Sequence, residues 1–225
     1  HRNAEVQKLR AENRKLGKQI INLEEGLEIR KGVSIPVEGK PIQANDKILH
    51  EATAIAMLSD VHWGEVVDGA TIGGVNEYTP EIAAASVSRF FELVRWHIDM
   101  LRSRIEITEL VLILGGDLIT GHLHDELLEV NAIGPIPEAI AVQAAIKSGI
   151  DYLLLDKHLH LNICCVYGNH GRITPKRRHS TGARHSIERY LYSNLATLFE
   201  DCDRTTWTIA DGAHVYQDIY GDTIR

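Results

Sequence analysis

The 225-residue sequence is poor in cysteine and has no long apolar segment. Only three cysteines occur, and Cys164 and Cys165 are adjacent, so on a strand their side chains would point to opposite faces. We therefore expect no disulfide framework, and the composition favours a reducing, cytoplasmic compartment. No run approaches the roughly 18 consecutive apolar residues of a membrane span, and no secretory signal opens the sequence. The sequence predicts a protein without a membrane partner.

An excess of positive charge is also lacking. The formal net charge is −7, which is unlike the uniformly basic proteins that coat nucleic acid. A local basic patch is still compatible with this balance. Hydrophobic residues make up 44% and charged residues 24%, which are ordinary values for a globular protein. A chain of this length can form one good-sized core with an appendage, but hardly two full domains.

Residues 5–30 contain no proline, and their apolar residues alternate three and four apart. If Val6 occupies an a position of a heptad, Asn13 also falls at an a position. A buried Asn at this position pairs best with its own copy, which favours a parallel dimer. We therefore predict a homodimer through a coiled-coil helix over residues 1–31. The alternative is a helix that packs its apolar stripe on the main domain.

Glycine and proline in residues 32–50 predict a linker, and the pattern changes after it. Apolar runs at 52–58, 110–114 and 161–167 alternate with helical periodicity at 80–104, 137–158 and 183–199. Strands that alternate with helices predict an α/β fold with a largely buried sheet over residues 51–225.

Each of the three apolar runs ends in a short polar cluster, namely Ser59-Asp60-Val61-His62, Gly115-Gly116-Asp117 and Gly168-Asn169-His170. The carboxyl ends of parallel strands meet at one rim of a sheet, so we expect these side chains to converge there. Carboxylate, imidazole and amide donors together suit Mn, Fe or Zn rather than calcium. The sequence therefore predicts a metal site at this rim.

The order D-x-H, then G-D, then G-N-H resembles the calcineurin-like metallophosphoesterase family, including its phage or prophage members. The resemblance implies a β-sandwich flanked by helices and two divalent metal ions, with Mn favoured and Fe or Zn as alternatives. It assigns Asp60 and His62 to the first metal, Asp117 to both, and Asn169 to the second. His170 would act as general acid or stabilise the transition state. The implied reaction is hydrolysis of phosphate esters by a metal-bridging hydroxide.

Two departures from the family pattern affect these expectations. Gly171 stands where the family usually has Asp or Glu, which could leave His170 less well oriented. The sequence also has no G-H-x-H block, so we expect the carboxy-terminal ligands to be missing from this chain. With those ligands absent, the expected state is metal-free or a single weakly bound ion.

A dense cationic segment follows His170 and includes Arg172, Arg177 and Arg178. We predict that these arginines hold phosphates of the substrate, and the alternative is a solvated loop. Trp63 either stacks on a base or plugs its loop against the core. The leading prediction is a dimeric phosphodiesterase or nuclease that acts on nucleic acid. The alternatives are a small-molecule phosphatase or phosphodiesterase, and a non-catalytic dimeric module for binding or assembly with a degraded site.

Overall fold

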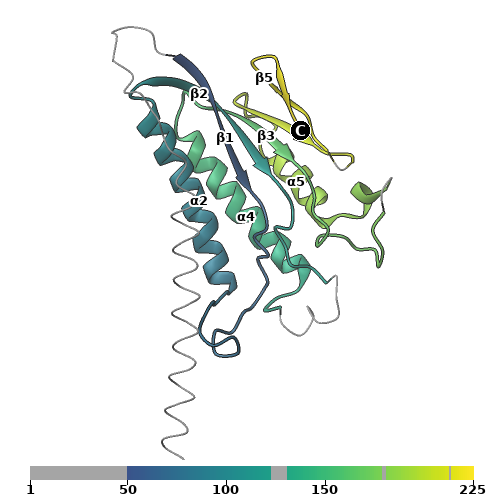
Figure 1. Cartoon of the computed structure of the whole chain (residues 1–225). Helices are drawn as coiled ribbons and strands as arrows, with labels where there is room; N and C mark the ends of the chain where they lie inside the picture. Colours follow the sequence, from purple (N-terminus) through teal and green to yellow (C-terminus); the bar gives the residue numbers. More distant parts are fainter. Residues whose placement is uncertain (1–49, 123–130, 179–180, 213) are drawn as a thin grey trace, which may run out of the picture. The chain divides into compact units, whose positions relative to one another are not determined.

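The computed structural model describes residues 50–122, 131–178, 181–212 and 214–225 (Figure 1). Residues Leu49–Arg225 form one compact unit. The predicted coiled coil over residues 1–31 and the predicted linker up to residue 49 lie outside the described residues.

A four-stranded parallel sheet forms the centre of this unit. Its strands are β1 (His50–Leu58), β2 (Ile105–Leu114), β3 (His160–Cys165) and β4 (Thr205–Ile209), and they neighbour one another in that order. Leu58 pairs with Leu114, and Leu114 pairs with Cys165. The carboxyl ends of β1, β2 and β3 therefore lie level, as the sequence predicted, and the α/β fold is confirmed.

Three α-helices in the described residues connect the strands: α2 (Pro80–Leu101), α4 (Pro135–Leu154) and α5 (Ile187–Leu198). A short 3₁₀-helix, η1 (Gly182–His185), precedes α5. The Thr79 side chain caps α2 by accepting from the backbone N–H of Ile82 at 3.4 Å. Ser186 caps α5 in the same way, accepting from the N–H of Arg189 at 3.2 Å. These caps begin the helices close to their predicted positions.

The helices and one face of the sheet enclose a single core (Figure 1). Alternate residues of β2, Leu110, Leu112 and Leu114, point into it and are fully buried. Helices α2 and α4 approach closely where Gly149 meets Phe91, because a Cβ at position 149 would lie 2.1 Å from the Phe91 ring. The apolar faces of both helices are buried in this layer. Their packing holds in place the sheet whose strand ends carry the predicted site.

The opposite face of the sheet is covered in part by a two-stranded antiparallel sheet, β5 (Gln217–Ile219) and β6 (Asp222–Ile224). A cleft of about 370 Å³ lies between the two layers and is lined by Val111 and Cys164 on one side and Val215 on the other. On β1, Ile55 and Met57 line the same cleft and remain 50% and 60% exposed. Within the described ranges, none of the helices combines the length and apolarity needed to span a bilayer.

Candidate metal centre

The loops that follow β1 and β2 continue side by side beyond the ends of the strands. The N–H of Asp60 donates to the carbonyl of Gly116 at 3.0 Å, and the N–H of His62 donates to the carbonyl of Asp117 at 3.0 Å. Asp60, His62 and Asp117 all have positive φ, at 54°, 45° and 48°. Such a backbone costs about 1–3 kcal/mol per non-glycine residue and is concentrated at functional sites. The pairing of these loops brings His62 beside Asp117.

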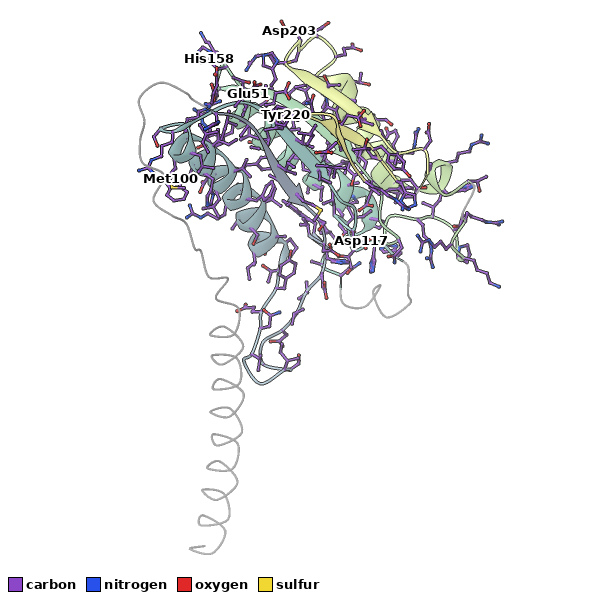
Figure 2. The ribbon with its side chains drawn as sticks, turned by 45° about the horizontal axis from the view of Figure 1, so that its top comes forward. Glu51, Met100, Asp117, His158, Asp203 and Tyr220 are labelled. Carbon is purple, nitrogen blue, oxygen red and sulfur yellow. The ribbon has the colours of Figure 1, made fainter. Side chains whose placement is uncertain are left out.

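Three side chains meet at this rim. The ligand atoms of His62, Asp117 and His170 all lie within 4.8 Å of one another. The rings of His62 and His170 are edge to face, with centroids 4.6 Å apart. Figure 2 shows Asp117 at the carboxyl end of the sheet, opposite the end where His158 and Asp203 lie. Two imidazoles and a carboxylate are donors suited to a divalent transition metal, so the group is a possible metal-binding site.

Asp60, a predicted ligand on the loop that pairs with Gly116, is not a member of this group. The side chain of Asp60 is exposed. Asn169 lines an adjoining cavity. The role of both residues as metal ligands therefore stays a prediction. Trp63 is only 7% exposed and belongs to the hydrophobic core, which favours its role as a plug for the loop.

His170 is held by two contacts. Its backbone N–H donates to Oδ1 of Asp117 at 2.9 Å. Its ring Nδ1 lies 2.8 Å from the carbonyl oxygen of Thr120. Because a carbonyl can only accept, Nδ1 must carry a proton, which leaves Nε2 as the atom free to bind a metal or exchange a proton. His170 was predicted as a general acid, and the structure places its ring within the possible metal-binding group.

Two glycines allow the loops after β2 and β3 to approach. Gly116 has φ of +87°, and a Cβ there would lie 2.2 Å from the backbone nitrogen of Gly168. A Cβ on Gly168 would in turn lie 2.1 Å from Oδ1 of Asp117. The Gly-Asp and Gly-Asn motifs are therefore needed for close contact between backbones as well as for turning the chain.

Two fully buried glutamates support the site, and sequence reasoning missed both. Glu138 of α4 accepts from the N–H groups of Thr120 and Gly121 at 3.0 and 3.1 Å. Glu188 of α5 accepts from the N–H groups of Leu118 and Gly168 at 2.6 and 2.7 Å. Each glutamate lies in the first turn of its helix. The only sequence signal was an acidic residue at a helix start, which is typical of solvated helices too.

Burial raises the pKa of Glu188 to about 7. The hydrogen bonds from Gly168 and Leu118 oppose this rise, and the charge of Asp117 adds to it. The space beside Gly171 is also occupied by Glu188, because a Cβ at position 171 would lie 2.8 Å from its Cγ. The acidic side chain expected at position 171 therefore has no room there, and a carboxylate from α5 lies in its place.

A cavity of about 230 Å³ adjoins the possible metal-binding group and is lined by Gly168 and Asn169. The three predicted substrate-binding arginines, Arg172, Arg177 and Arg178, all contribute to its wall. The guanidinium of Arg172 donates to the carbonyls of Thr174 and Pro175 at 3.1 and 3.3 Å, which fixes its direction. Cations gathered around a cavity next to a metal-type cluster can bind phosphate groups.

No protein-family model, curated protein or solved structure matches this chain. The resemblance to metallophosphoesterases therefore rests on the sequence motifs alone.

Proposed function

We propose that the protein is a metal-dependent phosphoesterase that hydrolyses phosphodiester bonds of nucleic acid. The observation that carries the proposal is the group of His62, Asp117 and His170, whose ligand atoms lie within 4.8 Å of one another. The arginine-lined cavity beside that group supports phosphate as the anion that is bound. We also propose that the four-stranded sheet and the β5–β6 sheet are the two layers of a metallophosphoesterase-type β-sandwich.

The proposed site binds divalent metal, with Mn favoured and Fe or Zn as alternatives. Asp60, His62 and Asp117 would hold one ion, and three protein donors leave positions for water and substrate. Asp117 and Asn169 would hold a second ion only weakly, and His170 would stay uncoordinated so that its Nε2 can exchange a proton. Bound divalent metal lowers the pKa of water and offsets the charge on phosphate oxygens.

The residues of the chain position the substrate and move a proton. The carbonyl of Thr120 holds Nδ1 of His170 whether the ring is neutral or cationic. Nε2 can therefore donate a proton to the leaving oxygen without reorienting the ring. Arg172, Arg177 and Arg178 would bind phosphates next to the one that reacts.

The proposal is tested by measuring Mn²⁺ binding and oligonucleotide hydrolysis with the full chain. Asp117→Asn should abolish both, because it removes the only carboxylate in the group. Asp201→Asn, at an exposed site, is the matched control and should change neither. Hydrolysis of nitrophenyl esters without oligonucleotide cleavage would favour the small-molecule alternative. Mn²⁺ binding without any turnover would favour the non-catalytic module.

The arginines are tested separately through salt dependence. Replacing Arg177 and Arg178 by alanine should weaken oligonucleotide binding, and each lost phosphate contact should reduce the slope of log affinity against log salt by about 0.7–0.9. The exposed pair Arg89 and Arg104, replaced together, removes the same charge elsewhere and should leave the slope unchanged. Equal slopes for both double variants would contradict a phosphate-binding role for the cavity.

A further inference from the structure

We infer that Glu188 is a positioning residue that holds the loops after β2 and β3 at the separation at which Asp117 and His170 meet. The role of this positioning in metal binding rests on the proposed function. The contacts that support it come from the backbone and are independent of any bound ion.

One carboxylate joins two loops from different strands. One oxygen of Glu188 accepts from the N–H of Leu118 at 2.6 Å, and the other accepts from the N–H of Gly168 at 2.7 Å. Leu118 directly follows Asp117, and Gly168 directly precedes Asn169. The carboxylate therefore holds the backbone next to one member of the metal-type group and next to one predicted ligand.

The strands themselves do not provide this connection. In the described residues, the last backbone hydrogen bond between β2 and the chain after β3 runs from the N–H of Val166 to the carbonyl of Leu114 at 2.9 Å. Beyond it, the two loops are joined by Glu188 and by two contacts of His170, from its N–H to the Asp117 carboxylate and from its ring Nδ1 to the Thr120 carbonyl. Glu188 therefore connects the loops after β2 and β3 in the region beyond the last backbone hydrogen bond between the two strands.

Helix α5 fixes the position of the Glu188 carboxylate. Glu188 lies in the first turn of α5, which Ser186 caps. The N–H of Ile187 donates to the carbonyl of Gly171 at 2.8 Å, so the start of the helix is bonded to the loop that carries His170. Glu188 is fully buried, and no arginine or lysine of the described residues forms an ion pair with it.

A buried carboxylate without a cation is costly unless hydrogen bonds compensate it. Hydrogen bonds from the two backbone N–H groups supply that compensation, and they are stronger when the carboxyl is ionised. An apolar residue at position 188 would pack in the same space but would leave the N–H groups of Leu118 and Gly168 without their acceptor. The side chain at this position therefore acts on the loops rather than on the core.

The experiment uses the full chain, with Glu188→Gln as the main variant. Glutamine keeps the size and one acceptor oxygen but presents an NH₂ group to the second backbone N–H. Hydrogen exchange in metal-free protein should quicken at the amides of Leu118 and Gly168, while the Leu112 amide in the centre of β2 should not change. Unchanged exchange at both loop amides would overturn the inference, whatever the protein does with metal.

A second measurement is Mn²⁺ affinity by calorimetry. Supporting residues next to metal ligands typically contribute about 10–100-fold to metal affinity, and we expect Glu188→Gln to lower it by at least about 10-fold. Glu200→Gln, at an exposed position just after α5, should leave it unchanged. If the wild-type protein binds Mn²⁺ and Glu188→Gln binds it equally well, Glu188 is not a positioning residue. If the wild-type protein binds no Mn²⁺, the proposed function fails, and the exchange measurement still decides the role of Glu188.

A rescue variant separates positioning from simple folding. Because a Cβ at position 171 points at Cγ of Glu188, the double change Glu188→Ala with Gly171→Asp places a carboxylate in the vacated space. It should restore exchange protection at Leu118 and Gly168 and recover Mn²⁺ affinity relative to Glu188→Ala alone. Gly171→Asp in the presence of Glu188 should instead weaken Mn²⁺ binding, since the two side chains compete for one site. Failure of the double variant to improve on Glu188→Ala in either measurement would count against the inference.

Discussion

Gly149→Ala should destabilise the domain, although alanine is the better helix former. Gly149 lies inside α4 and faces Phe91 of α2. A Cβ at this position would lie 2.1 Å from Cδ2 and 2.3 Å from Cε2 of the Phe91 ring. Carbon atoms in contact are normally about 3.5–4.0 Å apart, so the ring would have to move by roughly 1.5 Å. Phe91 is only 2% exposed, so the core around it would have to take up that shift.

Two opposing terms set the size of the effect. Alanine in place of glycine inside a helix gains about 0.8–1.0 kcal/mol. Overpacking a filled core costs about 1–3 kcal/mol, and a required shift of this size favours the upper end of that range. The expected net loss is therefore about 1–2 kcal/mol. For a domain of this size, each kcal/mol lowers Tm by about 2–4 °C, so Tm should fall by about 2–8 °C.

The assay is urea unfolding followed by circular dichroism. Ser148→Ala is the matched control, because Ser148 is the neighbouring residue of α4 and is exposed. It should stabilise slightly through helix propensity alone. Combining Gly149→Ala with Phe91→Leu should cost less than the sum of the two single changes by about 1 kcal/mol, since the smaller side chain makes room for the methyl group. A Gly149→Ala protein as stable as the wild type would refute the close approach of α2 and α4.

Three further predictions concern the site, the pH dependence and the assembly. Gly168→Ala should lower Mn²⁺ affinity in calorimetry, because its methyl group would lie 2.1 Å from the Asp117 carboxylate, and unchanged affinity would contradict that contact. Burial alone would raise the pKa of Asp156, but hydrogen bonds from Arg102 and the backbone of residue 158, together with the charges of nearby arginines, lower it below its ordinary value. The ionised carboxylate therefore stabilises the fold above about pH 4, and this contribution is lost as the pH falls below that value. Asp156→Asn should flatten the acid limb of a plot of urea midpoint against pH, and a parallel acid limb would contradict the assignment. Asn13→Ile should raise helix stability and relax the oligomeric state if residues 1–31 form the predicted parallel dimer, and a monomer at high concentration in sedimentation equilibrium would exclude it.

The fold class and the rim of the sheet were predictable from sequence. Apolar runs bounded by glycine-containing polar clusters predict buried parallel strands, and parallel strands carry their carboxyl ends to one edge. This reasoning located His62, Asp117 and His170 correctly at that edge. It placed the start of β2 too late, because Glu106 and Glu109 interrupt the apolar pattern on the face that points away from the helices.

The supporting residues were decided by tertiary structure alone. Glu138 and Glu188 occur in the first turns of helices, where acidic residues are usual on solvated faces. Whether such a carboxylate faces water or the backbone of another loop depends on how the helix packs on the sheet. The exclusion of an acidic side chain at position 171 has the same origin, since the competing carboxylate is 17 residues away in the chain and only the packing of α5 brings it there. Local patterns determine which residues follow a strand, because backbone periodicity is local. The packing of distant elements determines which of them meet, because a hydrogen bond requires its two groups to lie within about 3 Å.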